Sequence, residues 1–205
     1  MSPWANRILK DFPADLARLW IVADPDGVLL DEHILLGLRE RGFEVLPFFD
    51  GIAFRAEGTK PLTHYDAKGR YSTHDFARSA RLWNIPFSMP DPFPAAAQDA
   101  SRLYIWLDRH QPQQAVPFLH AIYRPYFVGN RFIGDRAVVL QVAGETGIDT
   151  DQAAEAIADQ EIKDRLRELT REAVGDKGVF GAPTMIVDGE LFWGADRIDM
   201  LDQWL

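Results

Sequence analysis

Strand-forming sequence occurs only near the two ends of this chain, and the long middle is patterned for helices. Short apolar or β-prone runs lie at Leu19–Ala23, Phe43–Phe48, Thr184–Val187 and Glu190–Trp193. Between residues 73 and 175 the apolar residues recur at helical spacing, and no strand signal interrupts them. A single sheet must therefore bring the first and last segments together, with the helical stretch inserted between them.

The first two strand signals belong to a predicted βαβ unit. Residues Leu29–Arg41 carry apolar side chains at helical spacing, and Gly42 follows as a C-terminal stop. Strand, helix and strand over so short a length favour parallel strands joined by a right-handed crossover. At the other end, Asp188 and Gly189 are a two-residue hairpin signal, and a helix is expected over Ile198–Leu205. The predicted order is βαβ, helices, ββα.

The middle of the chain is expected to hold amphipathic helices. A proline-rich stretch from Ile85 to Pro94 separates the first two of them. We predict a sheet-containing part from residues 1–57 and 176–205, and a helical insertion over residues 58–175. The predicted helices, the last range being a charged pair, are Thr73–Trp83, Ala95–Arg109, Gln114–Tyr126, Arg136–Gly147 and Thr150–Gly175.

Composition argues against several classes of function. The chain has no cysteine, so its own residues form no disulfide and no thiolate metal site. Its net charge of −9 argues against a broad nucleic-acid surface. No apolar run is long enough to span a membrane, and the first residues mix charges such as Arg7 and Asp11 with apolar side chains, unlike a signal peptide. We therefore expect a soluble, cytoplasmic protein that binds neither nucleic acid nor membrane.

Several stretches together resemble one enzyme family. The most specific of them is Gly178–Arg197, and the others are Gly58–Leu62 with Lys68–Tyr71 and Asp75–Arg78, Pro90–Pro94, and Tyr123–Phe127. They are similar to the 2-hydroxychromene-2-carboxylate isomerases and kappa-class glutathione transferases, which are DsbA-like proteins. The resemblance implies an α/β thioredoxin-like fold with a large all-helical insertion. It also implies a homodimer with glutathione-dependent isomerase or transferase activity on a small aromatic acid or other hydrophobic substrate.

The resemblance further implies a glutathione site. Pro183 is expected in the cis form, which leaves the backbone of Ala182 free to pair with an extended peptide. Asp196 is expected to receive the γ-glutamyl amino group and Arg197 a carboxylate, although the same turn also holds the fold together. The expected cofactor-binding residues are Lys60, Ala182, Pro183, Ala195, Asp196 and Arg197.

Two positions depart from the pattern of this family. Asp24, before Pro25, stands where the family has the serine that holds the glutathione thiolate, and Ala95 stands where an asparagine is common. An ionised carboxylate donates no hydrogen bond, and its charge raises the pKa of a neighbouring thiol. We therefore expect catalysis at Asp24 to be impaired, and a non-catalytic thioredoxin-like scaffold is an alternative interpretation.

The N-terminal segment resembles a different group of proteins. Residues Leu19–Glu57, with the stretches DPDGVLLDE, LRERGFEVLPF and FRAE, are similar to the N-terminus of the PglZ-type proteins of bacterial phage-exclusion systems. This similarity stops at Glu57, where the isomerase-like sequence begins. One interpretation is a chimera, natural or built, of two α/β pieces joined at a βαβ unit.

Three aspartates offer a second alternative function. Asp24 and Asp26 follow the first predicted strand and Asp50 follows the second, so all three would gather at the carboxyl edge of parallel strands. Hard oxygen ligands there could hold magnesium in a metal-dependent hydrolase, although aspartates are also common turn residues. The histidines show no metal-ligand spacing. Aromatic side chains that either line a substrate pocket or pack in the core are Trp83, Phe87, Phe93 and Trp106.

Overall fold

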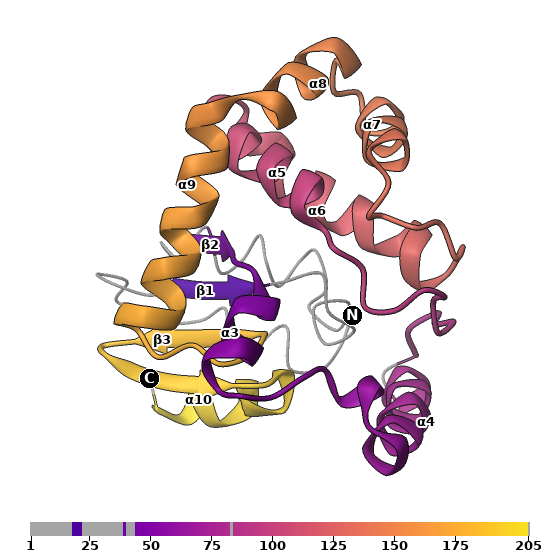
Figure 1. Ribbon diagram of the computed structural model, residues 1–205, viewed down its shortest axis with the longest axis vertical. Coiled ribbons are helices and arrows are strands. Elements are labelled where there is room, and N and C mark those ends of the chain that lie inside the picture. Colours follow the sequence, from indigo (N-terminus) through magenta and orange to yellow (C-terminus); the bar gives the residue numbers. More distant parts are fainter. Residues whose placement is uncertain (1–17, 22–38, 40–43, 83, 205) are drawn as a thin grey trace.

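The computed structural model describes residues 18–21, 39, 44–82 and 84–204, which Figure 1 shows as coloured ribbon. Within them the chain forms a four-stranded sheet and a group of helices. Two strands come from each end of the sequence, as predicted. The strands are β1 (Arg18–Ile21), β2 (Glu44–Pro47), β3 (Thr184–Val187) and β4 (Glu190–Trp193).

The strand order is β2-β1-β3-β4, with β1 and β2 parallel and the other pairs antiparallel. Trp20 of β1 lies opposite Thr184 of β3, so strands from the two ends of the chain are neighbours. Asp188 and Gly189 form the β3–β4 turn with φ values of 50° and 84°, which suit a two-residue hairpin. This topology confirms the thioredoxin-like fold. The helix predicted over Leu29–Arg41 lies, apart from Arg39, outside the described residues.

The helices follow the predicted order, with two corrections. Helix α3 was not predicted, because its few apolar residues are too short a pattern to show helical periodicity. Helix α4 begins at Asp66 rather than at Thr73, because its polar first half carries no apolar stripe. The helices are α3 (Asp50–Ala56), α4 (Asp66–Leu82), α5 (Gln98–His110), α6 (Pro112–Phe127), α7 (Arg136–Glu145), α8 (Thr150–Ala158), α9 (Gln160–Arg171) and α10 (Ile198–Trp204), with short turns η1 (Leu62–His64), η2 (Glu172–Asp176) and η3 (Ala195–Arg197).

Aspartate caps mark where three consecutive helices begin. The carboxylate of Asp135 accepts a hydrogen bond from the N–H of Ala137 at 2.9 Å, at the start of α7. Asp149 and Asp159 cap α8 and α9 in the same way. Each cap satisfies backbone donors that a helix leaves unpaired at its first turn. The repeated caps explain why the chain turns sharply between these helices instead of continuing as one.

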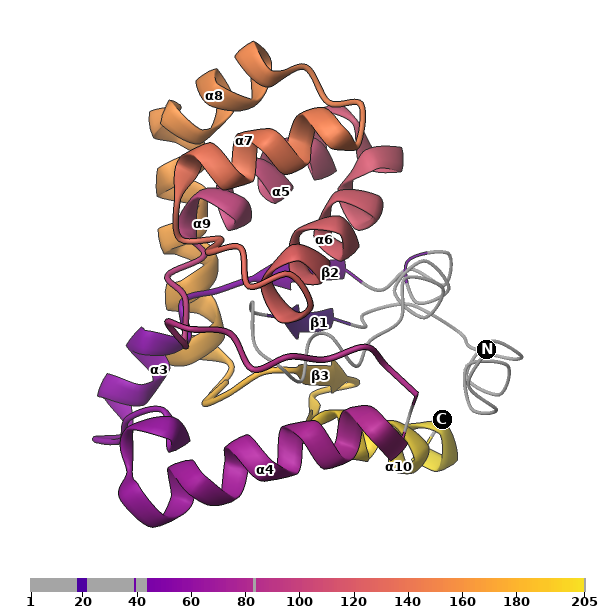
Figure 2. The same cartoon turned by 90° about the vertical axis from the view of Figure 1, so that its right-hand side faces the viewer.

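The sheet has a helical layer against each of its faces. Leu46 and Ile186 pack with Leu166 and Leu169 of α9, and Figure 2 shows α9 running beside the strands. Met185, which points to the opposite face, belongs to the larger core that includes residues of α5 to α8 and α10. The strand β2 therefore contacts both α5 and α9. The division of the chain at residues 58 and 176 stays a prediction.

Helix α4 lies apart from this packed body. In both Figure 1 and Figure 2 it stands away from helices α5 to α9, at the end of the segment that follows α3. The loop that leaves α4 returns to the helices through Phe87 and Phe93, whose rings pack against the ring of Phe127. Among the helices that the structure describes, none is both long and apolar enough to cross a membrane.

Candidate functional site

A cavity of about 720 Å³ opens where β2 ends. Its walls come from α3, from the segment that leads into α5, from α9 and from η2. The carboxyl end of a parallel strand is a common ligand-binding position in α/β folds. We call this space the edge cavity, and its main lining residues are Phe48, Asp50, Arg55, Ala95, Ser101 and Thr170.

Buried hydrogen bonds fix the walls of the edge cavity. The backbone N–H of Phe49 donates to Oγ1 of Thr170 at 3.2 Å, which ties the end of β2 to α9. The Thr170 hydroxyl in turn donates to the carbonyl of Leu166 at 2.8 Å. Thr170 is 1% exposed, so its hydroxyl is shielded from water and depends on these two bonds. On the other side of β2, the buried hydroxyl of Tyr104 donates to the carbonyl of Val45 at 3.1 Å.

Asp50 brings a partly buried carboxyl group to the edge cavity. It is the first residue of α3, and its Oδ1 accepts a hydrogen bond from the N–H of Gly51 at 2.7 Å. Burial raises the pKa of Asp50, and the bond from Gly51 only partly offsets this effect. A carboxyl group whose proton is held to higher pH than usual is suited to proton transfer.

The arginines that line the edge cavity are mostly engaged with neighbours. Arg171 pairs with Asp176 at 3.0 Å, and Arg167 pairs with Asp164. Arg55 turns back along α3 and donates from Nε to the carbonyl of Gly51 at 3.3 Å. These residues were not predicted as site residues, although Arg167 and Arg171 are one helical turn apart and therefore share a face of α9.

The metal hypothesis is tested at only one of its three residues. Asp50 lies at the edge of the parallel strand β2, where it was expected. Asp24 and Asp26 lie outside the described residues, and so does the catalytic position proposed at Asp24. In the part of the chain that the structure describes, no three acidic or histidine side chains gather as they would around a metal ion.

Pro183 and the segment after β4 are brought together, as the predicted cofactor site requires. The peptide bond between Ala182 and Pro183 is cis, as predicted. The carbonyl of Pro183 accepts a hydrogen bond from the N–H of Gly194 at 2.9 Å, directly before Ala195. Gly194 has a φ of 103°, which strongly favours glycine at this turn. The backbone N–H of Ala182 has no hydrogen-bond partner among the described residues.

The remaining predicted cofactor residues fall in two separate places. Asp196 and Arg197 lie in η3, are exposed, and pair with each other at 3.1 Å. Lys60 lies in the segment before η1, where its ammonium group is 4.5 Å from the ring centre of Tyr65. None of the contacts described for Lys60 reaches Pro183 or Asp196. The structure therefore joins Asp196 and Arg197 to the Pro183 turn and leaves Lys60 beside α4.

The predicted aromatic residues pack rather than line the edge cavity. Phe93 stacks on Tyr126 with 6.5 Å between ring centres, and Trp106 packs on His110 at 5.0 Å. Phe87 stacks on Phe127 at 6.1 Å and also lines a second cavity beside α4. Trp83 lies outside the described residues. The core interpretation thus accounts for Phe93 and Trp106.

Sequence comparison places these features among known proteins. A 2-hydroxychromene-2-carboxylate isomerase from Sphingobium xenophagum is 30% identical over 131 residues, which are 64% of this chain and 65% of that protein. Glutathione s-transferase kappa 2 from Caenorhabditis elegans is 25% identical over 170 residues, which are 77% of this chain and 75% of the transferase. The chain thus spans slightly less than two thirds of the length of the isomerase.

Comparison with solved structures agrees on the fold. A 2-hydroxychromene-2-carboxylate isomerase superposes with a TM-score of 0.80 at 19% identity, covering 92% of this chain and 93% of the other. The cytosolic disulfide reductase DsbM from Pseudomonas aeruginosa, solved with GSH, superposes with a TM-score of 0.62 at 17% identity, covering 92% and 94%. The model of the DSBA-like thioredoxin domain matches residues 46–205. The fold, the cis peptide at Pro183 and this match agree, and the chain belongs to the family of DSBA-like thioredoxin domains.

Proposed function

We propose that this protein is a glutathione-dependent isomerase or transferase of the 2-hydroxychromene-2-carboxylate isomerase type. Its substrate would be a small aromatic acid or another hydrophobic molecule. The observation that carries the proposal is the joined turn, in which Gly194 bonds to Pro183 and sets Asp196 and Arg197 beside it. The similarity to an isomerase and to a kappa-class transferase supports the same chemistry.

The residues of this turn fit glutathione. An extended peptide needs backbone groups to pair with, and the N–H of Ala182 has no partner among the described residues. The exposed carboxylate of Asp196 suits the γ-glutamyl amino group, and the guanidinium of Arg197 suits a carboxylate. Lys60 provides a further cation on the α4 side. When bound, glutathione would supply a thiol that adds to an unsaturated substrate and later leaves it.

In this proposal the edge cavity holds the hydrophobic part of the substrate. Phe48 and Ala95 provide apolar walls, and the carboxyl group of Asp50 exchanges a proton at the same end of the sheet. We assign Asp24, which lies outside the described residues, to the catalytic position, where a negative charge disfavours a nearby thiolate. The replacement Asp24→Ser should therefore raise glutathione-dependent turnover, whereas an unchanged rate and affinity would count against this assignment. A homodimer and a cytoplasmic location belong to the same proposal.

A non-catalytic scaffold is the second candidate. It is favoured by Ala95, whose methyl group lines the edge cavity where the family commonly places an asparagine. A scaffold of this kind would keep the fold and lose the polar groups that act on a thiol. A chimeric origin of the N-terminal segment would give the same result, because the serine position lies in that segment.

Calorimetric titration separates the two candidates. We expect glutathione to bind, and S-methylglutathione to bind more weakly because its thiol is blocked. Asp196→Asn should weaken glutathione binding by about tenfold, which corresponds to about 1.4 kcal/mol. Asp188→Asn is the matched control, since Asp188 lies in the β3–β4 turn, outside η3, and asparagine also tolerates its positive φ. No binding at millimolar glutathione would overturn the proposal and leave the scaffold.

A further inference from the structure

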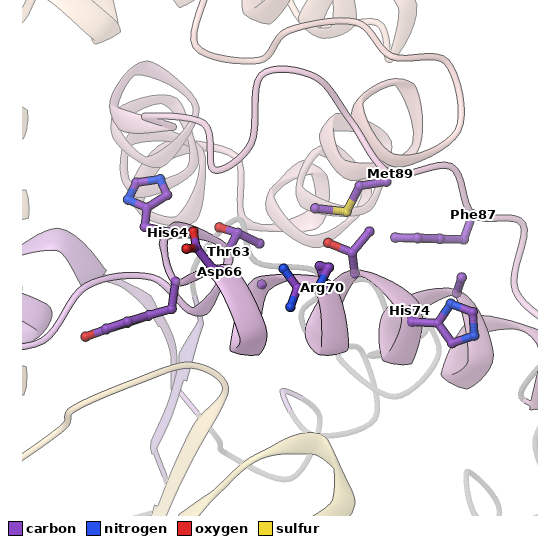
Figure 3. A pocket seen from close by; sticks show the side chains of 11 residues that line it. Thr63, His64, Asp66, Arg70, His74, Phe87 and Met89 are labelled. Carbon is purple, nitrogen blue, oxygen red and sulfur yellow. The ribbon is translucent and has the colours of Figure 1, made fainter.

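A second cavity, of about 800 Å³, lies along α4, between this helix and the loop that carries Phe87 and Met89. Figure 3 shows Arg70 at its centre, with Phe87 and Met89 facing the helix from the following loop. The two cavities share no lining residue. We call this space the α4 cavity, and its main lining residues are Thr63, Asp66, Arg70, His74, Phe87 and Met89.

One positive group, the guanidinium of Arg70, lies at the centre of the α4 cavity, although the chain as a whole is acidic. Arg70 has no carboxylate partner among the described residues, in contrast to the paired Arg167 and Arg171 of the edge cavity. His74 follows one turn later on the same face of α4. Tyr65 lines the cavity at the end opposite to His74. The ammonium groups of Lys60 and Lys68 lie over its ring, at 4.5 Å and 5.0 Å from the ring centre.

The remaining charged or titratable groups lie at one end of the cavity. Asp66 and His64 line it beside Thr63, at the left of Figure 3, and Asp66 is the only carboxylate among the described lining residues. Oγ1 of Thr63 is buried beneath this end and has no hydrogen-bond partner among the described residues. This end therefore offers a carboxylate to a polar substituent, while the middle offers a guanidinium that has no ion-pair partner among the described residues.

The opposite wall is apolar and held in place. The Phe87 ring stacks on Phe127 at 6.1 Å, which anchors the loop to α6. The floor is also close-packed, since a Cβ at Gly69 would lie 2.9 Å from the carbonyl oxygen of Thr63. A site in which an exposed guanidinium faces a fixed apolar wall suits a planar ligand that has an anionic group on an apolar body.

We propose that the α4 cavity is a second binding site, which takes a small aromatic carboxylate. Arg70 binds the carboxylate, Phe87 and Met89 cover the ring, and the carboxylate of Asp66 accepts a hydrogen bond from a ring hydroxyl. The proposal goes beyond the glutathione chemistry above, because it involves neither the Pro183 turn nor the edge cavity. Binding at the α4 cavity would occur whether or not the protein binds glutathione.

Methyl labelling of methionine tests the site directly. The protein with ¹³C-methyl methionine is titrated with salicylate, and benzamide serves as a neutral aromatic comparison. Met89 lines the α4 cavity, whereas Met185 is buried in the sheet, so the two methyl signals distinguish this site from the sheet core. We expect the Met89 signal to shift with salicylate, and benzamide to bind at least about tenfold more weakly.

A pair of arginine variants tests whether the guanidinium of Arg70 binds the carboxylate. Arg70→Gln should weaken salicylate binding at least about tenfold. Arg81→Gln removes the same charge from the same helix, but Arg81 does not line the cavity, so the affinity should not change. The proposal would be overturned if the two variants lost the same affinity for salicylate. It would also be overturned if benzamide bound as tightly as salicylate, or if the Met89 signal did not shift. Glutathione binding is measured separately, and its absence leaves this result unaffected.

Discussion

The two cavities of this molecule are built in opposite ways. The edge cavity lies among core elements, where buried hydrogen bonds join β2 to α5 and α9. The α4 cavity lies between one outlying helix and a loop, and its central arginine makes no ion pair among the described residues. Residues of the edge cavity therefore serve the fold as well as any ligand. Residues of the α4 cavity are available mainly to a ligand, so stability and binding should respond differently to mutation there.

The largest loss of stability should follow from truncating Phe48. This side chain is 1% exposed and packs with Leu46 and Ala53, so Phe48→Ala leaves a cavity in the core. We expect a loss of about 3–5 kcal/mol in the free energy of unfolding, measured by urea denaturation. Met89→Ala in the partly exposed α4 cavity should cost markedly less. Similar losses would show that both cavities are equally part of the core.

Removing one hydroxyl should also lower stability more at the edge cavity than at the α4 cavity, by a smaller amount than the truncation of Phe48. Thr170→Val keeps the shape of the side chain but leaves the partly buried N–H of Phe49 without its acceptor, which costs about 1–3 kcal/mol. Thr73→Val is the control, because Thr73 is exposed and lines the α4 cavity. Its effect on stability should stay within about 0.5 kcal/mol. Chemical denaturation of both variants tests the difference.

The helix cap of α8 tests whether the packed helices influence the α4 cavity. The carboxylate of Asp149 accepts hydrogen bonds from the N–H groups of Asp151 and Gln152 at the start of α8. Asp149→Ala should lower the free energy of unfolding by about 1 kcal/mol. Salicylate binding at the α4 cavity should not change, since α8 contributes nothing to its lining. A weaker affinity in this variant would show that the bundle and α4 are coupled.

The pH dependence of stability should report on Asp50. Burial raises its folded-state pKa above the ordinary value of 3.8, so the folded protein binds the proton more tightly than the unfolded chain. The contribution to stability is then complete below the ordinary pKa and is lost as the pH rises through the raised one. Asp50→Asn should remove this loss, so the variant gains stability relative to the parent from acidic to neutral pH. Parallel pH profiles would contradict the assignment.

The sheet was predictable from the sequence because its signals are local. The hairpin turn at Asp188 and Gly189 and the apolar run of β3 each carry their own pattern, and both are found where expected. Helix α3 was missed because it is short and held by the elements around it. Its Ala53 is fully buried against residues of the sheet and α9, a contact that no local pattern reports.

The candidate site was predictable only in part, for a related reason. The turn at Pro183 was found through a contiguous motif, and its bond to Gly194 confirms that the two segments meet. The edge cavity combines α3, α9 and the segment before α5, which are far apart in sequence. The importance of Arg70 depends on its having no acidic partner among the described residues, which sequence spacing does not show.

The position of β1 has a consequence for how the chain is made. Strand β1 pairs with β2 on one side and with β3 on the other, and β3 lies near the end of the sequence. During translation β1 and β2 emerge early, and all of helices α3 to α9 follow before β3 is synthesised. Until then one edge of β1 has no partner, and an open strand edge invites association with other chains. We expect this protein to depend most on chaperones while it is still attached to the ribosome.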